Sequence, residues 1–231
     1  MKTNITTTNV QFIKNSIIKK INIIMNSFIS MLNFQKEKSD FLSKNDKSKK
    51  GSIDNDIKET VDLINSKDDY YTTSSCAGRI VLLEMKSRRK DECNWLLSKH
   101  SKVTFNEIKK ILKECNIKNN PIKKDKNKKM NYQIWFKQQP LILHVSCRHL
   151  DAAKKLLDLS RKVFKHSGIL SISENKAVVE IIGNEKIETV IADKNFIAEE
   201  NYIKQLVKYA NSNFEENKRK SDRFLEIVNK I

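Results

Sequence analysis

The sequence predicts an α+β fold, in which a single domain contains a mixed β-sheet flanked by helices. Segments rich in β-branched and aromatic residues alternate with helical patterns over most of the chain. Three strand patterns then follow one another directly near the C-terminal end, as in a meander. The chain has only four glycines, and none of them forms a G-x-G-x-x-G or Walker A loop. A Rossmann-type nucleotide site is therefore not expected.

Length and charge set broad limits on the function. A chain of 231 residues with 39% hydrophobic residues can bury one core, so one domain is expected and two small domains are the alternative. The formal net charge of +17 favours a polyanionic partner such as nucleic acid or an anionic membrane surface. Only seven of the basic residues are arginines, and Lys, Asn and Ile dominate the chain, as an AT-rich coding sequence would produce. The charge alone therefore does not identify the partner.

The cysteine spacing argues against a zinc-finger type of protein, and the apolar runs argue against a membrane-spanning one. The four cysteines are widely spaced, without a C-x-x-C pair or an alternation with histidine, so no metal site is predicted. They are typical of reduced thiols in a cytosolic compartment. Lys19 and Lys20 interrupt the only long apolar stretch, at residues 17–31, so no membrane partner is predicted.

The N-terminal residues 1–33 are expected to be an extension outside the folded domain. No acidic residue precedes Glu37, and apolar residues recur at helical spacing between Phe12 and Phe28. An acid-free, Ser/Thr-rich, amphipathic N-terminus is similar to an organellar transit peptide. The alternatives are a disordered extension, or translation that begins at Met25 or Met31. The folded domain is predicted to cover residues 34–231.

The first half of this domain contains the following expected elements. A helix begins at Ser52 or Asp54 and keeps its apolar residues on one face. Strands are expected at 70–73, 79–83 and 93–97, with a tight loop at 74–78 between the first two. Thr104 and Glu107 form a capping box, which starts a helix that continues to Cys115. Residues 116–130 are Lys-rich and are predicted to be a surface insertion.

The second half repeats the alternation. Strands are expected at 132–136 and 141–148, followed by a helix capped by Asp151. A meander is predicted at 169–173, 177–182 and 187–191, with turns at 174–175 and 183–184. A long amphipathic helix at 198–227 closes the chain.

The segment 72–79 is the most unusual local stretch. Its small residues allow the backbone to turn and to point successive N–H groups at an anion, and Arg79 adds donors. A carboxylate, a phosphate or a ribose would fit such a site. The alternative is a small-residue hairpin whose hydroxyls are satisfied internally. Cys76 is either a nucleophile or a structural thiol.

The strand at 141–148 is the second candidate. Alternate residues of a strand share a face, so His144, Ser146 and Arg148 should line one polar face. Buried polar groups need partners, so these side chains should meet water, one another or a ligand. His100 and His144 are candidate bases, and a structural role for each histidine remains the alternative.

Several blocks together resemble the tRNA wybutosine-synthesising protein 3 family over residues 34–229. The most specific block is T-T-S-S-C-A-G-R-I at 72–80. The further blocks are K-G-S-I-D at 50–54, I-N at 64–65, Trp95, His100, L-H-V at 143–145 with Cys147 and Arg148, S-G-I at 167–169 and E-E-N-K at 215–218.

The resemblance implies a non-Rossmann methyltransferase that uses S-adenosyl-L-methionine. Its substrate would be 7-(3-amino-3-carboxypropyl)-4-demethylwyosine, the guanosine-derived base 3′ of the tRNA-Phe anticodon, which it would methylate on N4. The partners implied are the anticodon loop of tRNA-Phe and the cofactor. A non-catalytic, basic RNA-binding module with the same fold is the alternative. The expected location is cytoplasmic, or organellar if residues 1–33 are a transit peptide, and the oligomeric state is left open.

The resemblance also implies the site residues. His100 and His144 are the candidate catalytic bases, and Trp95 either stacks on a base or adenine or packs in the core. Ten residues are expected to bind cofactor or substrate: Thr73, Ser74, Ser75, Cys76, Gly78, Arg79, Ser146, Arg148, Ser167 and Gly168.

Several segments depart from the family pattern, including the following three. Gln139 stands where the family usually has Glu, Lys165-His166 replace Arg-Asn, and Ile182-Gly183 replace Arg-Ser. A contact with substrate at the missing Glu or Arg would shift substrate affinity or the form of substrate accepted. The block at 72–80, His100, His144 and Arg148 are retained, which favours activity.

Overall fold

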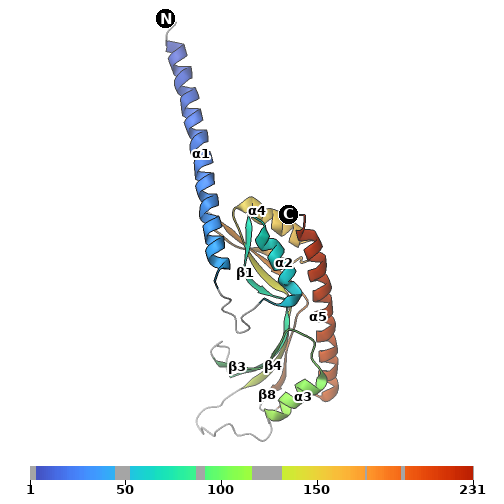
Figure 1. The fold of residues 1–231 in the computed structure, drawn as a ribbon. Coiled ribbons are helices and arrows are strands. Elements are labelled where there is room, and N and C mark those ends of the chain that lie inside the picture. Colours follow the sequence, from blue (N-terminus) through green and yellow to red (C-terminus); the bar gives the residue numbers. More distant parts are fainter. Residues whose placement is uncertain are drawn as a thin grey trace, which may run out of the picture.

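The computed structural model describes residues 4–44, 53–86, 92–115, 132–174, 176–193 and 196–230. Five helices and eight strands lie in these ranges (Figure 1). In chain order they are α1 (Asn4–Leu42), α2 (Asn55–Ser66), β1 (Tyr70–Cys76), β2 (Arg79–Met85), β3 (Cys93–Lys99), α3 (Phe105–Glu114), β4 (Gln133–Gln139), β5 (Ile142–Cys147), α4 (Leu150–Ser160), β6 (Gly168–Ile172), β7 (Ala177–Ile182), β8 (Ile187–Asp193) and α5 (Glu200–Val228).

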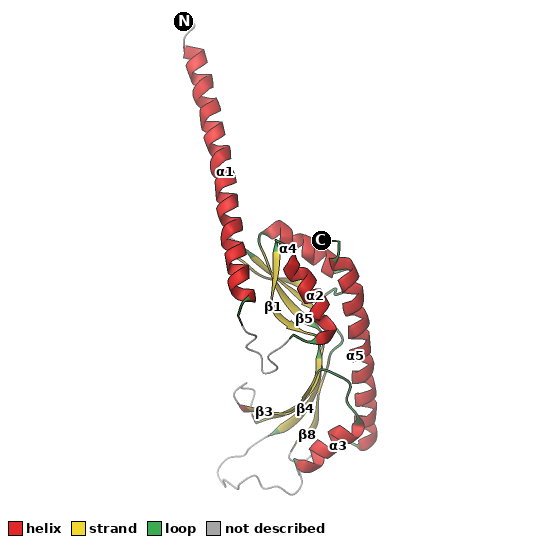
Figure 2. Cartoon of the chain, viewed as in Figure 1, coloured by secondary structure: helices red, strands yellow, loops and turns green. Residues whose placement is uncertain are grey.

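The strands form two four-stranded sheets, which lie in the upper and lower parts of Figure 2. The first sheet has the order β1-β5-β7-β6 and the second has the order β3-β2-β4-β8. All pairings among the described strands are antiparallel. The α+β class and the single domain are confirmed. The prediction of one mixed sheet is wrong, because the strands form two antiparallel sheets. The reason is that the chain crosses from one sheet to the other after β1, after β4 and after β7.

Each sheet has its own hydrophobic core. In the first sheet, alternate residues of β5 (Leu143, Val145 and Cys147) pack with residues of α2, α4 and the end of α5. In the second sheet, residues of β2, β4 and β8 pack with α3 and the first half of α5. Helix α5 therefore runs along both sheets and contributes to both cores (Figure 1). Its apolar spacing predicted a long helix, and the structure confirms it.

The three crossings between the sheets meet at one place, which we call the waist. The waist consists of residues 77–78, 140–141 and 183–186, which connect the strands in pairs. The buried Asn217 of α5 connects two of the crossings: its Oδ1 accepts the Leu141 N–H at 2.8 Å, and its Nδ2 donates to the Ala77 carbonyl at 2.6 Å. Gly78 has φ +99°, and an added Cβ would lie 2.9 Å from Asn217 Nδ2. A side chain at this position would be strained on both counts.

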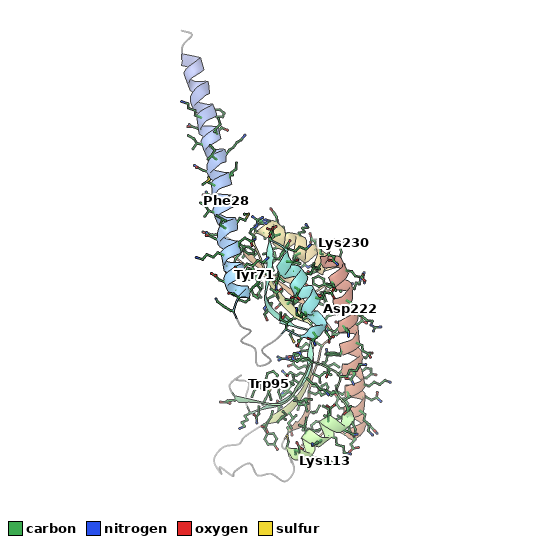
Figure 3. All side chains as sticks on the ribbon, viewed as in Figure 1. Phe28, Tyr71, Trp95, Lys113, Asp222 and Lys230 are labelled. Atoms are coloured by element: carbon green, nitrogen blue, oxygen red, sulfur yellow. The ribbon has the colours of Figure 1, made fainter. Side chains whose placement is uncertain are left out.

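Among the described side chains of α1, those that contact the body lie near its C-terminal end. Phe34 is the first buried side chain in the part of α1 whose side chains are described. Phe34 and Phe41 pack on Tyr71, and Lys38 donates to the Lys67 carbonyl at 2.6 Å. The preceding turns extend away from the body, and Phe28 lies on this part (Figure 3). Helix α1 runs across the predicted boundary at Phe34. That boundary and a targeting role for residues 1–33 both stay predictions.

Local details confirm some predictions and correct others. The capping box of Thr104 and Glu107 is present at the start of α3. The predicted cap of α4 at Asp151 is wrong, because His149 is the N-cap and its Nδ1 accepts the Ala152 N–H at 3.0 Å. The insertion at 116–130 lies outside the described residues, as do Ser52 and the turn residue Asn175. Among the described helices, none has an apolar stretch that would span a lipid bilayer.

Candidate functional site

A large cavity lies beside β1 and the waist. Its volume is about 1730 Å³, larger than the roughly 300–1000 Å³ of common small-molecule pockets. The ends of α1 and α2, the strand β1, the facing strands β2 and β3, and the waist all contribute lining residues. Seven of the predicted site residues line it: Thr73, Ser74, Ser75, Cys76, Arg79, Trp95 and His100.

The small residues of β1 form the edge of this cavity. They belong to the strand as far as Cys76, where a tight loop was predicted, and the register between β1 and β5 shifts between Thr72 and Ser74. The hairpin alternative is wrong, because β1 pairs with β5 whereas β2 pairs with β3 and β4. The left-handed Gly78 allows the chain to leave one sheet and enter the other within two residues.

Arg79 and Trp95 form the side of the cavity that belongs to the second sheet. The Arg79 guanidinium carbon lies 4.8 Å from the centre of a Trp95 ring, a cation–π contact. Arg79 Nε donates to Gln139 Oε1 at 2.6 Å, so the residue that departs from the family pattern contacts the site directly. Trp95 is 44% exposed, which rules out core packing as its role. Its exposed ring is suited to stacking on a base.

His100 lies at the end of β3 and contacts two side chains. Its Nδ1 is 2.9 Å from Asp54 Oδ2 and 3.8 Å from Cys76 Sγ. Asp54 is buried, and the same Oδ2 accepts the Ala77 N–H at 2.9 Å. Burial raises the pKa of the Cys76 thiol, so this group is protonated at neutral pH. A protonated thiol does not fit the role of nucleophile.

These three side chains also form a group of metal-ligand type. One ligand-type atom from each of Asp54, Cys76 and His100 lies within 4.8 Å of those from the other two. The 2.9 Å separation of Asp54 and His100 is a hydrogen-bond distance, and Cys76 carries its proton at neutral pH. The contacts in the structure are therefore those of a hydrogen-bonded group, and the sequence-based expectation of no metal site stays a prediction.

The other predicted site residues do not line the cavity. His144 Nε2 lies 3.1 Å from Glu180 Oε1, and Gly168 is paired with Glu180 in the register of β6 and β7. Arg148 pairs with Asp69 at 2.5 Å beyond the far end of β5, roughly 20 Å along the strand from Ile142. The polar face predicted for β5 is therefore divided among separate contacts. Three predicted site residues remain. Ser146 and Ser167 are buried, and Gly78 belongs to the waist.

Sequence reasoning missed several residues of the cavity. Asp54 was interpreted only as a helix cap, yet its carboxylate makes no capping hydrogen bond and instead contacts Ala77 and His100. Thr72 lines the cavity, and its buried Oγ1 has no hydrogen-bond partner among the described residues. Residues from other parts of the chain also line it: Lys99 at the end of β3, His166 before β6, and Asn184 and Lys186 of the waist. Asp54 and Thr72 lie in family blocks, and His166 stands at a departure from the family pattern, whereas Lys99, Asn184 and Lys186 gave no such signal.

Comparisons with known proteins agree with these observations. Residues 29–230 match the protein family described as "Methyltransferase TYW3". The chain is 34% identical over 197 residues to the tRNA wybutosine-synthesizing protein 3 homolog of Mus musculus, covering 83% of this chain and 71% of that protein. It is 32% identical over 186 residues to a Pyrococcus abyssi protein named tRNA(Phe) 7-((3-amino-3-carboxypropyl)-4-demethylwyosine(37)-N(4))-methyltransferase 1, covering 79% of this chain and 89% of that protein.

The fold is similar to that of a solved structure of a Pyrococcus horikoshii protein. The TM-score is 0.71 at 31% sequence identity, and the match covers 86% of this chain and 97% of the other.

Proposed function

Because this chain belongs to the TYW3 methyltransferase family, we propose that it methylates N4 of 7-(3-amino-3-carboxypropyl)-4-demethylwyosine in tRNA-Phe with S-adenosyl-L-methionine. The observation that carries this proposal is the cavity beside β1, where the most specific sequence block contributes six lining residues between Thr72 and Arg79. The cavity is large enough for a cofactor and a tricyclic base together.

The residues present fit S-adenosylmethionine. Thr72 Oγ1 is a buried hydroxyl with no partner among the described residues, and it lines the cavity. The Arg79 guanidinium suits a carboxylate, which both the cofactor and the side chain of the substrate carry. The exposed Trp95 ring suits adenine or the tricyclic base. S-adenosylmethionine supplies an electrophilic methyl group bound to a sulfonium sulfur.

The protein's own contribution is alignment and proton removal. Arg79, Ser74 and Ser75 orient a carboxylate at the edge of β1, which fixes the reacting groups relative to each other. A proton on the accepting nitrogen must be removed, and His100 is the histidine of the two candidates that lines the cavity. His144 does not line it, and its Nε2 is paired with Glu180. We therefore assign proton removal to His100.

Electrostatics support a tRNA partner. The net charge of +17 would attract any RNA through its phosphates, and this attraction weakens as salt concentration rises. The charge contributes affinity without distinguishing one tRNA from another. Selection of the substrate base therefore rests on the residues of the cavity.

The decisive experiment is mass spectrometry of tRNA-Phe nucleosides from cells that lack this protein. We expect the 4-demethyl intermediate to accumulate, and unchanged later products would refute the function. Arg79→Ala and Ser75→Ala should fail to restore methylation, whereas Arg223→Ala, which removes an exposed arginine of α5 outside the cavity lining, should restore it. If calorimetry detected no binding of S-adenosylmethionine or S-adenosylhomocysteine, the non-catalytic RNA-binding alternative would replace the enzyme.

We also place the protein in the cytoplasm, where its four free cysteines would stay reduced. The acid-free segment before Glu37 keeps an organellar destination as the alternative. Tagged full-length chain and a tagged chain that starts at Met31 should show the same distribution. A difference between the two would assign a targeting function to the first 30 residues.

A further inference from the structure

We propose that Asp54 is a positioning residue that holds the His100 ring with its proton on Nδ1. The opposite nitrogen, Nε2, is then the atom that accepts a proton in the cavity. This inference rests on the proposed methyltransferase function for its chemical meaning. The arrangement itself rests on contacts that do not depend on that function.

The first step is that Asp54 is itself held in place. It is 6% exposed, and its backbone forms the N-cap of α2 in an extended conformation. Its Oδ2 accepts the N–H of Ala77, which belongs to the waist. One carboxylate thus connects α2, the waist and the end of β3, so the position of the ring is set by three separate parts of the fold.

The second step concerns the proton between Asp54 and His100. Oδ2 accepts the Ala77 N–H at 2.9 Å, and a carboxylate oxygen that accepts this bond is an acceptor toward the ring as well. The hydrogen in the 2.9 Å contact with Nδ1 therefore belongs to the imidazole. A neutral imidazole has one N–H, so Nε2 carries a lone pair.

The third step is that Nε2 is available. The contacts of His100 with Asp54 and Cys76 both involve Nδ1, and within the described parts of the chain no hydrogen bond to Nε2 is present. Cys76 Sγ is 3.8 Å from Nδ1, within the wider range for sulfur, and Asp54 is the closer partner of the same atom. The other candidate, His144, differs in that its Nε2 is paired with Glu180 at 3.1 Å.

The chemical consequence is a defined route for one proton. His100 Nε2 accepts the N–H proton of the substrate nitrogen, and the electron pair of that bond stays on nitrogen. The nitrogen lone pair forms the new bond to the methyl carbon, while the carbon–sulfur bond breaks and its electron pair goes to sulfur. The pair left behind by the departing proton restores the lone pair on nitrogen. The resulting imidazolium keeps its Nδ1 proton against the Asp54 carboxylate, which stabilises the positive charge. The proton then passes from Nε2 to solvent.

The test measures the tautomer directly in the full chain. Two-bond proton–nitrogen spectra of protein labelled with ¹⁵N-histidine report which ring nitrogen carries hydrogen, and His100→Gln assigns the signals. We expect the Nδ1–H form of His100 in the wild type and loss of that preference in Asp54→Asn. Asp56→Asn is the matched control, since Asp56 is also in the first turn of α2 but pairs with Lys218 at the surface. An Nε2–H tautomer in the wild type would overturn the proposal even if Asp54→Asn did not fold.

Activity supplies a second readout. Asp54→Asn should lower kcat by about 100-fold, while the affinity for S-adenosylhomocysteine measured by calorimetry changes less than about twofold. A purely structural role would instead weaken binding and turnover together, and that result would contradict the proposal. If the wild type proved inactive, the proposed function would fail, yet the spectra would still decide the tautomer.

Discussion

Asn217 offers the sharpest test of how the two sheets are held together. Its side chain is 2% exposed and makes two hydrogen bonds to backbone groups of the waist, one to the Leu141 N–H and one to the Ala77 carbonyl. Asn217→Ala removes both partners at once and leaves the two backbone groups in a place that water reaches poorly. The expected result is a large loss of stability.

The magnitude follows from the cost of unsatisfied buried groups. Each such group costs about 1–3 kcal/mol, so the substitution should lower the free energy of unfolding by about 2–6 kcal/mol. This is a large fraction of the roughly 5–15 kcal/mol typical of folded proteins. With a urea dependence of about 2 kcal/mol per molar, a loss of 4 kcal/mol lowers the unfolding midpoint by about 2 M.

The assay is urea unfolding of the full chain, followed by far-ultraviolet circular dichroism. The matched control is Asn213→Ala, one turn earlier on α5, whose single bond to the Gln138 side chain is 3.3 Å long and lies in a half-buried place. This control should lose less than about 1 kcal/mol. A loss below about 1 kcal/mol for Asn217→Ala would refute the role of this residue at the waist.

Three further predictions concern charge and pH. Gln139→Glu places a carboxylate beside Arg79 Nε and should weaken binding of S-adenosylhomocysteine by about fivefold in calorimetry, and unchanged affinity would show that Arg79 binds no carboxylate of this ligand. Burial raises the pKa of the Cys76 thiol above 9.0, so iodoacetamide should label this thiol slowly at neutral pH and faster at more alkaline pH. S-adenosylhomocysteine should slow the labelling further, and labelling that the ligand does not slow would place Cys76 outside the binding site. The hydrogen bond from Lys176 lowers the pKa of Glu37 below 4.5, so this pair stabilises the docked end of α1 above pH 4.5 and loses its effect as the pH falls through the lowered value. Amide exchange of residues 34–42 should therefore speed up as the pH falls through the lowered pKa of Glu37, beyond the intrinsic change, and the Glu37→Gln variant should not show this dependence.

Much of the fold was predictable because local signals agreed with the final structure. The period of the apolar residues gave α2, α3 and α5, and the alternation in β5 placed Leu143, Val145 and Cys147 in the core. The division into two sheets was not predictable, because it depends on which strands pair after the chain passes Gly78. A single sequence contains no direct record of such long-range pairing.

The candidate site was predictable only where it coincides with one continuous block. Arg79 and the small residues of β1 lie in the cavity as expected. Arg148 does not, because a strand extends about 3.4 Å per residue and carries this side chain to the other end of the sheet. Asp54 reaches His100 across 46 positions of sequence, and no local pattern reports that contact.

The waist has a consequence for unfolding in the presence of ligand. Each sheet packs against its own hydrophobic core, and helix α5 contributes to both cores. Three short crossings of the chain connect the two sheets. A ligand held by β1 on one side and by Arg79 and Trp95 on the other would add contacts that span both cores. Saturating ligand should then raise the free energy of unfolding of both sheets together, so that any separate unfolding transitions merge into one cooperative step. Unfolding of the ligand-free protein would show whether the two sheets unfold separately.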